Sequence, residues 1–316
     1  MKGLIALPII LGTMLLIGGG AVVAVGLAHN KGDTKMVENE HELSESFTNI
    51  NIDLQTANLE FVATTDGTAK VVCNEREKYP HDVEVKDGTL NIKFVDKVKW
   101  YEKIFNWNWK TETITVYMPV ADYTNLKIET STGSTKIKGD YTFENLDIKA
   151  STGAVYLESD VTEKVNIYLS TGAIHIKDME TKSMNLKAST GNMYLQKVNV
   201  DGKLYTKAST GDIILEDVTA KEYESKTSTG DLTLTDTIID GHLQAECSTG
   251  HVKFNDSDAK TMYVKTDTGY IKGTLLTEHI FSYKTDTGHV SVPKGTTGGL
   301  CELITDTGDI VITIKK

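Results

Sequence analysis

The chain has 316 residues, a formal net charge of −11 and 39% hydrophobic residues. This length and apolar content suit one long folded domain or two ordinary ones, and they argue against a disordered chain. The acidic balance argues against a nucleic-acid partner, because the phosphates of such a partner need Lys and Arg for neutralisation.

The N-terminal segment contains a long apolar run. Residues 3–28 carry no charged side chain, and these 26 residues exceed the roughly 20 that a helix needs to cross the hydrocarbon core of a bilayer. The run is also longer than the usual apolar region of a signal peptide, although residues 26–28 form a small-x-small sequence that suits cleavage. We therefore expect residues 1–30 to be a transmembrane anchor, with a cleaved signal peptide as the alternative.

The residues that flank the apolar run indicate its orientation. Lys2 precedes the run, which favours a cytoplasmic N-terminus. The polar residues 31–42 are then expected to be a linker, and residues 43–316 an extracytoplasmic domain. We expect a single-pass protein of the cell membrane, or a secreted protein if the segment is cleaved.

Residues 43–125 have the pattern of irregular β-structure. Short alternating runs such as TLNIKF and TITVYMP indicate strands, and TTDGT and VKDGT indicate turns. One segment, residues 97–110, breaks this pattern and holds the aromatic residues Trp100, Tyr101, Phe105, Trp107 and Trp109. They either cover an open end of the fold or form an exposed patch that binds a protein, a glycan or a membrane. The sequence leaves both interpretations open.

Residues 126–316 contain a repeat marked by a Thr-Gly dipeptide. Its glycine recurs every 19 or 20 residues, at Gly133, Gly153, Gly172, Gly191, Gly211, Gly230, Gly250, Gly269, Gly288 and Gly308. Apolar residues alternate with polar ones on both sides of each glycine, which predicts two short strands per unit with one buried face. A second turn is expected six residues after the glycine, where Asp178, Asp217, Asp236 and Asp256 stand. A lysine column lies four residues before it, at Lys149, Lys187, Lys207, Lys226, Lys265 and Lys284.

A unit this short cannot bury its own apolar face, so the units must stack. We therefore predict an all-β fold: a parallel β-solenoid of about ten 19–20-residue coils over residues 126–316, capped by residues 43–125 and preceded by one transmembrane helix. At the usual spacing between strands, ten coils make a rod of roughly 48 Å.

The repeated tripeptides resemble catalytic motifs without meeting their requirements. A serine nucleophile needs a base, yet no histidine recurs at a matching offset from the Ser-Thr-Gly units. Asp-Thr-Gly is the tripeptide of aspartic proteases, but those enzymes oppose two such loops, whereas this chain has three in register with the other units. We therefore interpret Ser, Thr and Asp as side chains that cap turns, and we expect no catalytic residue and no cofactor.

The three Asp-Thr-Gly units place Asp267, Asp286 and Asp306 in one column. Stacked carboxylates repel one another and can recruit a cation. This acidic column is a candidate calcium site.

The cysteines and the C-terminal strand bear on metal binding and on self-association, respectively. Cys73, Cys247 and Cys301 lie far apart with no histidine at ligand spacing, so we expect neither a zinc site nor a disulfide framework. The final residues 308–316 form a strand without a cap, so end-to-end self-association through this C-terminal strand is expected as an option.

The Ser-Thr-Gly units, the LNIKF and TITVYMPV segments and the short N-terminal anchor resemble one bacterial family. It is the "putative adhesin" family, domain of unknown function four-zero-nine-seven, and the resemblance covers roughly residues 45–316. It implies a right-handed β-solenoid at the cell envelope, often in Gram-positive bacteria and often with envelope-stress response systems. It brings no catalytic residue with it.

These observations favour a non-enzymatic, membrane-anchored surface protein that binds an envelope protein or glycan, or serves envelope-stress regulation. The alternative is an enzyme that acts on envelope polysaccharide, since β-helices also host such enzymes. Charged residues spread along columns rather than gathering at one cleft, which disfavours the enzyme. A purely mechanical spacer is a third option.

Overall fold

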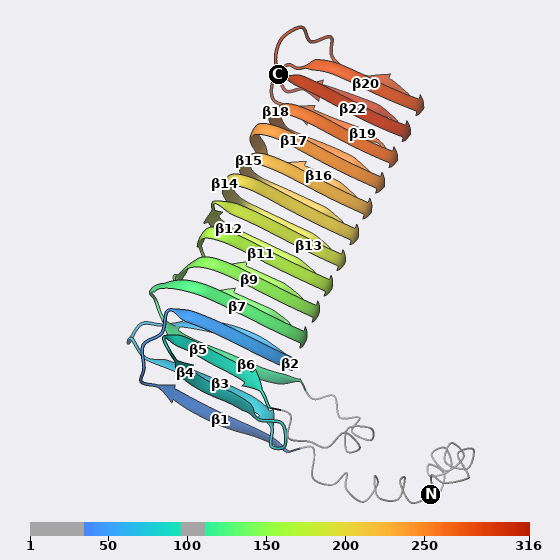
Figure 1. Cartoon of the computed structure of the whole chain (residues 1–316). Helices are drawn as coiled ribbons and strands as arrows, with labels where there is room; N and C mark the ends of the chain where they lie inside the picture. The colour runs from blue at the N-terminus through green and yellow to red at the C-terminus, as the bar shows by residue number, and fades with distance from the viewer. Residues whose placement is uncertain (1–34, 96–110) are drawn as a thin grey trace, which may run out of the picture.

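The computed structural model describes residues 35–95 and 111–316. All regular structure in these residues is β-strand, in one 23-stranded sheet that winds into an elongated solenoid (Figure 1). Across the described ranges, no helix has the length and apolar character needed to span a bilayer. The predicted anchor and the aromatic segment 97–110 lie outside the described residues.

The strands fall into a cap and a stack of coils. The cap and first coil contain β1 (Met36–Leu43), β2 (Asn49–Thr64), β3 (Ala69–Arg76), β4 (His81–Lys86), β5 (Thr89–Phe94) and β6 (Glu112–Pro119). The coils contain β7 (Asp122–Thr132), β8 (Thr135–Lys138), β9 (Thr142–Thr152), β10 (Val155–Glu158), β11 (Val161–Thr171), β12 (Ile174–Thr181), β13 (Ser183–Thr190), β14 (Met193–Thr210), β15 (Ile213–Thr229), β16 (Leu232–Thr235), β17 (Ile238–Thr249), β18 (Val252–Thr268), β19 (Ile271–Leu275), β20 (Ile280–Thr287), β21 (Val290–Ser291), β22 (Leu300–Thr307) and β23 (Ile310–Ile314).

The cap changes the pairing from antiparallel to parallel. Strands β1 and β3, β3 and β6, and β4 and β5 pair antiparallel, whereas β5 and β6 lie parallel to β2. Strand β2 also pairs with β7 and β8, so it is the first coil. Part of the expected linker is therefore wrong: residues 36–42 belong to β1, because they pair along the outer edge of β3.

The coils stack in register around glycine corners. The N–H of Gly211, for example, donates to the carbonyl of Thr229 in the next coil at 2.9 Å. The ten corner glycines have φ between 137° and 159°, a backbone conformation that L side chains rarely adopt. A Cβ on Gly211 would also overlap the carbonyl oxygen of Gly191 in the preceding coil. Glycine is therefore required by both conformation and space.

The predicted second turn is confirmed. Asp178, Asp217, Asp236 and Asp256 have φ between 46° and 55°, the left-handed conformation that Asp tolerates better than most residues. Lys197 occupies the same place in its coil with φ 53°. Sequence reasoning missed Lys197 because lysine has no marked preference for that conformation.

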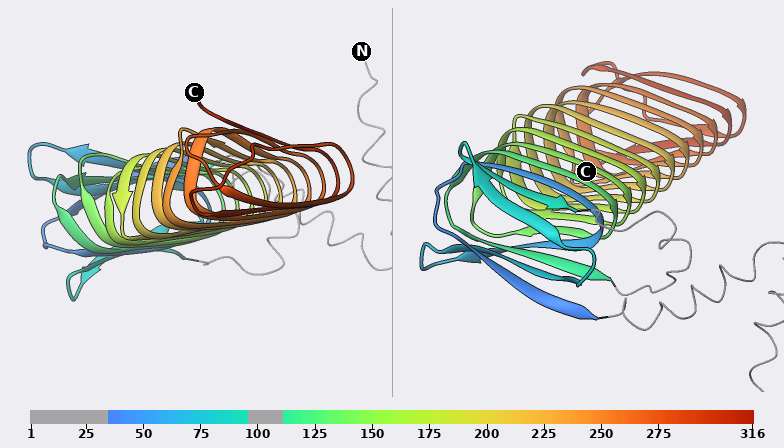
Figure 2. Two further views of the ribbon diagram at one scale, coloured as in Figure 1. Left: turned by 90° about the horizontal axis from the view of Figure 1, so that it is seen from above. Right: turned by 60° about the horizontal axis from the view of Figure 1, so that its bottom comes forward.

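The sequence pattern predicts that all coils stack in chain order, but the last coils do not. Strand β22 lies between β18 and β20 (Figure 1), and β23 lies between β19 and β21. Figure 2 shows the coils of the solenoid in two further views. The outermost coil, with β20 and β21, comes earlier in the chain than the coil beneath it, which contains β22 and β23. Asp258 fixes the start of this excursion by accepting hydrogen bonds from the Thr277 N–H at 2.7 Å and hydroxyl at 2.8 Å, while His279 Nε2 lies 2.8 Å from its other oxygen.

We predict that Gly211→Ala lowers the free energy of unfolding by at least about 3 kcal/mol, because the added methyl overlaps the neighbouring backbone. The matched control is Gly67→Ala, at φ 78° with open space around the added Cβ, where a loss of about 1 kcal/mol is expected. Denaturant unfolding measures both, and equal losses would contradict a steric role for the corner.

Candidate functional site

A groove runs along the solenoid beside the Thr-Gly corners. Its larger part, of about 680 Å³, crosses β2, β7, β9, β11, β13 and β14, and a part of about 250 Å³ continues over β15, β17 and β18. Both parts share Lys207, so we treat them as one feature, the corner groove. Its lining includes Asp53, Glu129, Ser131, Lys149, Ser151, Tyr168, Ser170, Lys187, Ser189, Lys207, Ser209, Lys226, Ser228, Glu246, Ser248, Lys265 and Asp267.

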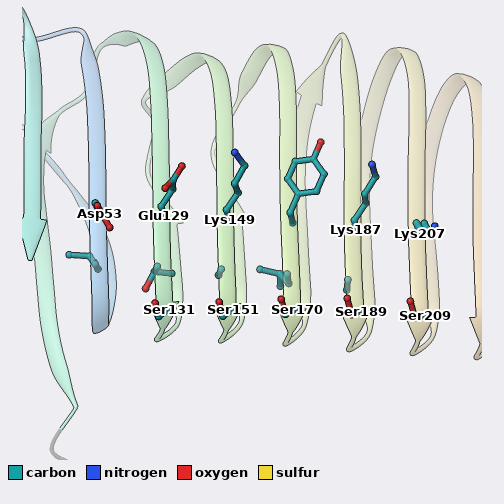
Figure 3. Close-up of a pocket in the computed structure, with 16 residues that line it drawn as sticks. Asp53, Glu129, Ser131, Lys149, Ser151, Ser170, Lys187, Ser189, Lys207 and Ser209 are labelled. Carbon is teal, nitrogen blue, oxygen red and sulfur yellow. The ribbon is translucent and has the colours of Figure 1, made fainter. Parts of the chain in front are cut away.

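The groove follows from three consecutive positions of the repeat. In the coil of β13, Lys187 and Ser189 point outward and Ala188 points into the core. The inward residue is small in most coils, which keeps the floor between the two outward rows low. Figure 3 shows the rows side by side, with Lys149, Lys187 and Lys207 in one and the serines in the other.

Two lysines of this groove have no carboxylate partner among the described residues. Lys187 Nζ lies 5.2 Å from the ring centre of Tyr168 and 5.4 Å from that of Tyr205. Lys207 lies directly between Lys187 and Lys226 in adjacent strands, although the three like charges repel. The groove thus has a positive middle section, in contrast with the net charge of −11.

The serine row does not cap the turns, which corrects that interpretation. Within the described part of the chain its hydroxyls make no hydrogen bond, whether to a histidine or to a backbone amide. Capping belongs instead to the residue after the glycine in the coils where that residue is Asn192, Asp212, Asp231, His251 or Asp309. Asn192 Oδ1 accepts from the Asp212 N–H at 2.9 Å, Asp212 Oδ1 from the Asp231 N–H at 2.8 Å, and Asp231 Oδ1 from the His251 N–H at 2.9 Å.

The acidic column exists, but in a different order. Because β22 lies between β18 and β20, Asp306 lies between Asp267 and Asp286. Lys265 contacts Asp267 at 3.1 Å, and Lys284 contacts Asp286 at 3.4 Å. The hydrogen bond and charge of Asp267, assisted by the charge of Asp306, raise the pKa of Lys265. These lysines offset the repulsion on which the expectation of a calcium site rested.

The structure reveals a second aromatic feature around the corner from the groove. The expected patch of Trp100, Tyr101, Phe105, Trp107 and Trp109 lies outside the described residues. Ring centroids of Tyr156 and His175 lie 4.8 Å apart, and those of His175 and Tyr194 lie 4.7 Å apart, in nearly parallel stacks. All three residues stand three places after a corner glycine, a signal that a search by column could have found.

The free end of the solenoid is not the C-terminal strand. Strand β23 pairs with β19 along its length and with β21 at its start, whereas β20 pairs with β22 alone among the described strands. Ile280 and Tyr283 of β20 are 48% and 51% exposed. The predicted end-to-end association stays a prediction, and β20 is the strand whose edge is available for it.

The cysteines are buried and unpaired in the structure. Cys247 and Cys301 occupy core columns. Cys73 differs, because Glu75 and His81 bring potential ligand atoms close to its thiol. The spacing of these residues in the sequence does not indicate this proximity, which arises because the turn between β3 and β4 brings His81 close to Cys73.

Comparison with known proteins identifies the family. The model of the Toastrack DUF4097 family matches residues 47–204 and 197–316. Solved structures that resemble the chain include a "putative adhesin" of Bacteroides fragilis, with 16% identity and a TM-score of 0.49 over 89% of this chain and 99% of that one. Another is a "putative lipid binding protein" of Parabacteroides distasonis, with 18% identity and a TM-score of 0.47 over 76% of this chain and 97% of that one. Comparison with curated proteins finds no match.

The aromatic stack predicts a pH dependence of stability. Burial lowers the pKa of His175 below its ordinary value of 6.5. The unfolded chain therefore binds this proton more readily, and stability falls as the pH drops through 6.5 towards the lower folded pKa.

An NMR titration should place the midpoint of the His175 ring below 6.5, and His175→Gln should flatten the change of unfolding free energy in that pH range. His242→Gln, which removes a histidine from an exposed site, is the control, and its effect on the profile should be smaller than that of His175→Gln. A His175 midpoint at or above 6.5 would refute the prediction.

Proposed function

The chain belongs to the Toastrack DUF4097 family, and from this premise we propose that it is a non-enzymatic binding protein of the cell envelope that holds an extended acidic glycan in the corner groove. One observation carries the proposal. The groove repeats a serine in coil after coil beside a row in which lysine is the commonest residue, and in its middle section Lys187 and Lys207 lack carboxylate partners beside serine hydroxyls without hydrogen bonds.

The periodicity of the groove suits a polymer better than a small molecule. Adjacent coils are separated by roughly 4.8 Å, so binding groups recur at that interval along the axis. A linear chain with a repeated acidic group can contact several coils at once, and many weak contacts then add up. The ammonium groups pair with the acids, and the serines can donate to or accept from sugar hydroxyls.

The charges in the groove support binding rather than hydrolysis. Asp53 and Glu129 lie in register at one end, where two carboxylates could act on a glycosidic bond. A general acid would need a raised pKa. The hydrogen bond and charge of Lys127 instead lower the pKa of Glu129. The polysaccharide-acting enzyme is therefore the weaker reading.

The location at the envelope rests on the sequence. Residues 3–28 contain no charge and are long enough to span a bilayer, and we propose that they anchor the chain with the solenoid outside the cell. The groove would then face the polymers of the envelope. An adhesive or stress-sensing role would follow from the same binding.

The test is binding of the full chain to a panel of linear glycans, with acidic and neutral members of equal length. We expect binding to acidic members only. The double variant Lys187→Ala/Lys207→Ala should weaken it about tenfold, since two exposed charge contacts contribute roughly 1.4 kcal/mol.

The matched control is Lys221→Ala/Lys260→Ala, which removes the same charge from exposed residues outside the groove. Equal weakening by both double variants would show that only net charge matters and would refute the groove. Equal binding of neutral glycans would refute the acidic ligand. Release of shortened products would instead favour the enzyme.

A further inference from the structure

A buried group of ionisable side chains lies in the cap, and none of its residues lines the corner groove. Cys73 and Glu75 alternate onto the inward face of β3, and His81 begins β4. Their exposed fractions are 0%, 1% and 4%. One potential ligand atom from each lies within 4.8 Å of the other two, and this is the one such group among residues 35–95 and 111–316.

Hydrogen bonds hold two of these side chains in place. His81 Nδ1 lies 2.6 Å from Glu75 Oε2, and the same oxygen accepts from the His81 backbone N–H at 2.7 Å. Glu75 Oε1 accepts from Asn39 Nδ2 at 2.6 Å. The imidazole and the carboxylate are therefore oriented before any ligand arrives.

The ion pair of Glu75 and His81 leaves a buried polar atom without a hydrogen-bond partner. His81 Nε2 is buried without a hydrogen-bond partner, and so is Glu112 Oε2 on the neighbouring strand β6. The register of β3 and β6 pairs Asn74 with Thr113, so Glu75 and Glu112 stand at the next position of the two strands. Orphaned buried polar atoms cost free energy, so the unpartnered Nε2 of His81 calls for an explanation.

We propose that the cap binds one zinc ion through the Cys73 thiolate, the Glu75 carboxylate and the His81 imidazole. Sulfur, nitrogen and carboxylate oxygen together are the donor set that zinc accepts. The charges also balance: the thiolate and the Glu75 carboxylate offset the two positive charges of the ion. Glu112 is offset separately by Arg76, whose Nε lies 2.6 Å from Glu112 Oε1.

Metal binding must release a proton. Burial and the charges of Glu75 and Glu112 raise the pKa of the Cys73 thiol to about 12, so the thiol is protonated at neutral pH in the absence of metal. Zinc would bind the free Nε2 of His81 and replace the thiol proton of Cys73, which leaves to solvent. Bound zinc would link β3 to β4 and so fasten the cap that covers the first coil.

The test uses the full chain, stripped with a chelator and titrated with Co²⁺ as a spectroscopic substitute for zinc. We expect a cobalt–thiolate charge-transfer band that saturates at one ion per chain and disappears when Zn²⁺ displaces the cobalt. Cys73→Ser should abolish the band, and His81→Gln should weaken Co²⁺ binding at least tenfold. The control Cys301→Ser changes another buried thiol and should leave the band intact.

Thermal unfolding of each metal-free variant shows whether it is folded, and Zn²⁺ should raise the midpoint of the wild type but not of Cys73→Ser. Three outcomes overturn the proposal. The wild type gives no thiolate band, the band survives Cys73→Ser, or Cys301→Ser removes it. Because none of these readouts involves a glycan, the zinc site and the corner groove stand or fall separately.

Discussion

The structure depends on the close stacking of one backbone on another at the Thr-Gly corner. Nine of the ten corner glycines, all but Gly288 in the outermost coil, donate the N–H to the adjacent coil, and the Cα of every corner glycine lies so near a backbone carbonyl of a neighbouring coil that no side chain fits. This contact sets the register of every coil, because a shift of one residue would turn the core face outward. The same contact aligns the core columns, the capping residues after the corner glycines and both outward rows of the groove.

Much of the fold could be predicted because its determinants are local and repeated. Glycine at one corner, aspartate at the other and alternation between them each have a direct conformational meaning. The order of the last coils could not be predicted for a specific reason. Thr266, Thr285 and Thr305 occupy the same column, and their strands carry equivalent patterns, so either order pairs equally well in register. The connection anchored at Asp258 decides the order, and its contacts are not periodic.

The candidate sites, like the fold, were predictable from the sequence only in part. The lysine column was visible in the sequence, but the absence of partners for Lys187 and Lys207 depends on which neighbours stand in adjacent coils. The cap cluster was hidden further, since Cys73 and Glu75 share a face by alternation whereas His81 reaches them only through the turn after β3. Function in this molecule is thus expected where the repeat is interrupted or where its outward residues vary.

The insertion of the final coil has a consequence for assembly of the molecule. Residues 300–314 occupy a place between coils that were made earlier, so the far end cannot be completed by adding coils as the chain emerges. Strands β20 and β21 of the outermost coil have no strands to pair with until β22 and β23 have been synthesised. A chain that ends before residue 300 would therefore lack β22 and β23, which lie between β18 and β20 and between β19 and β21, and the outermost strands β20 and β21 would lose their pairing partners.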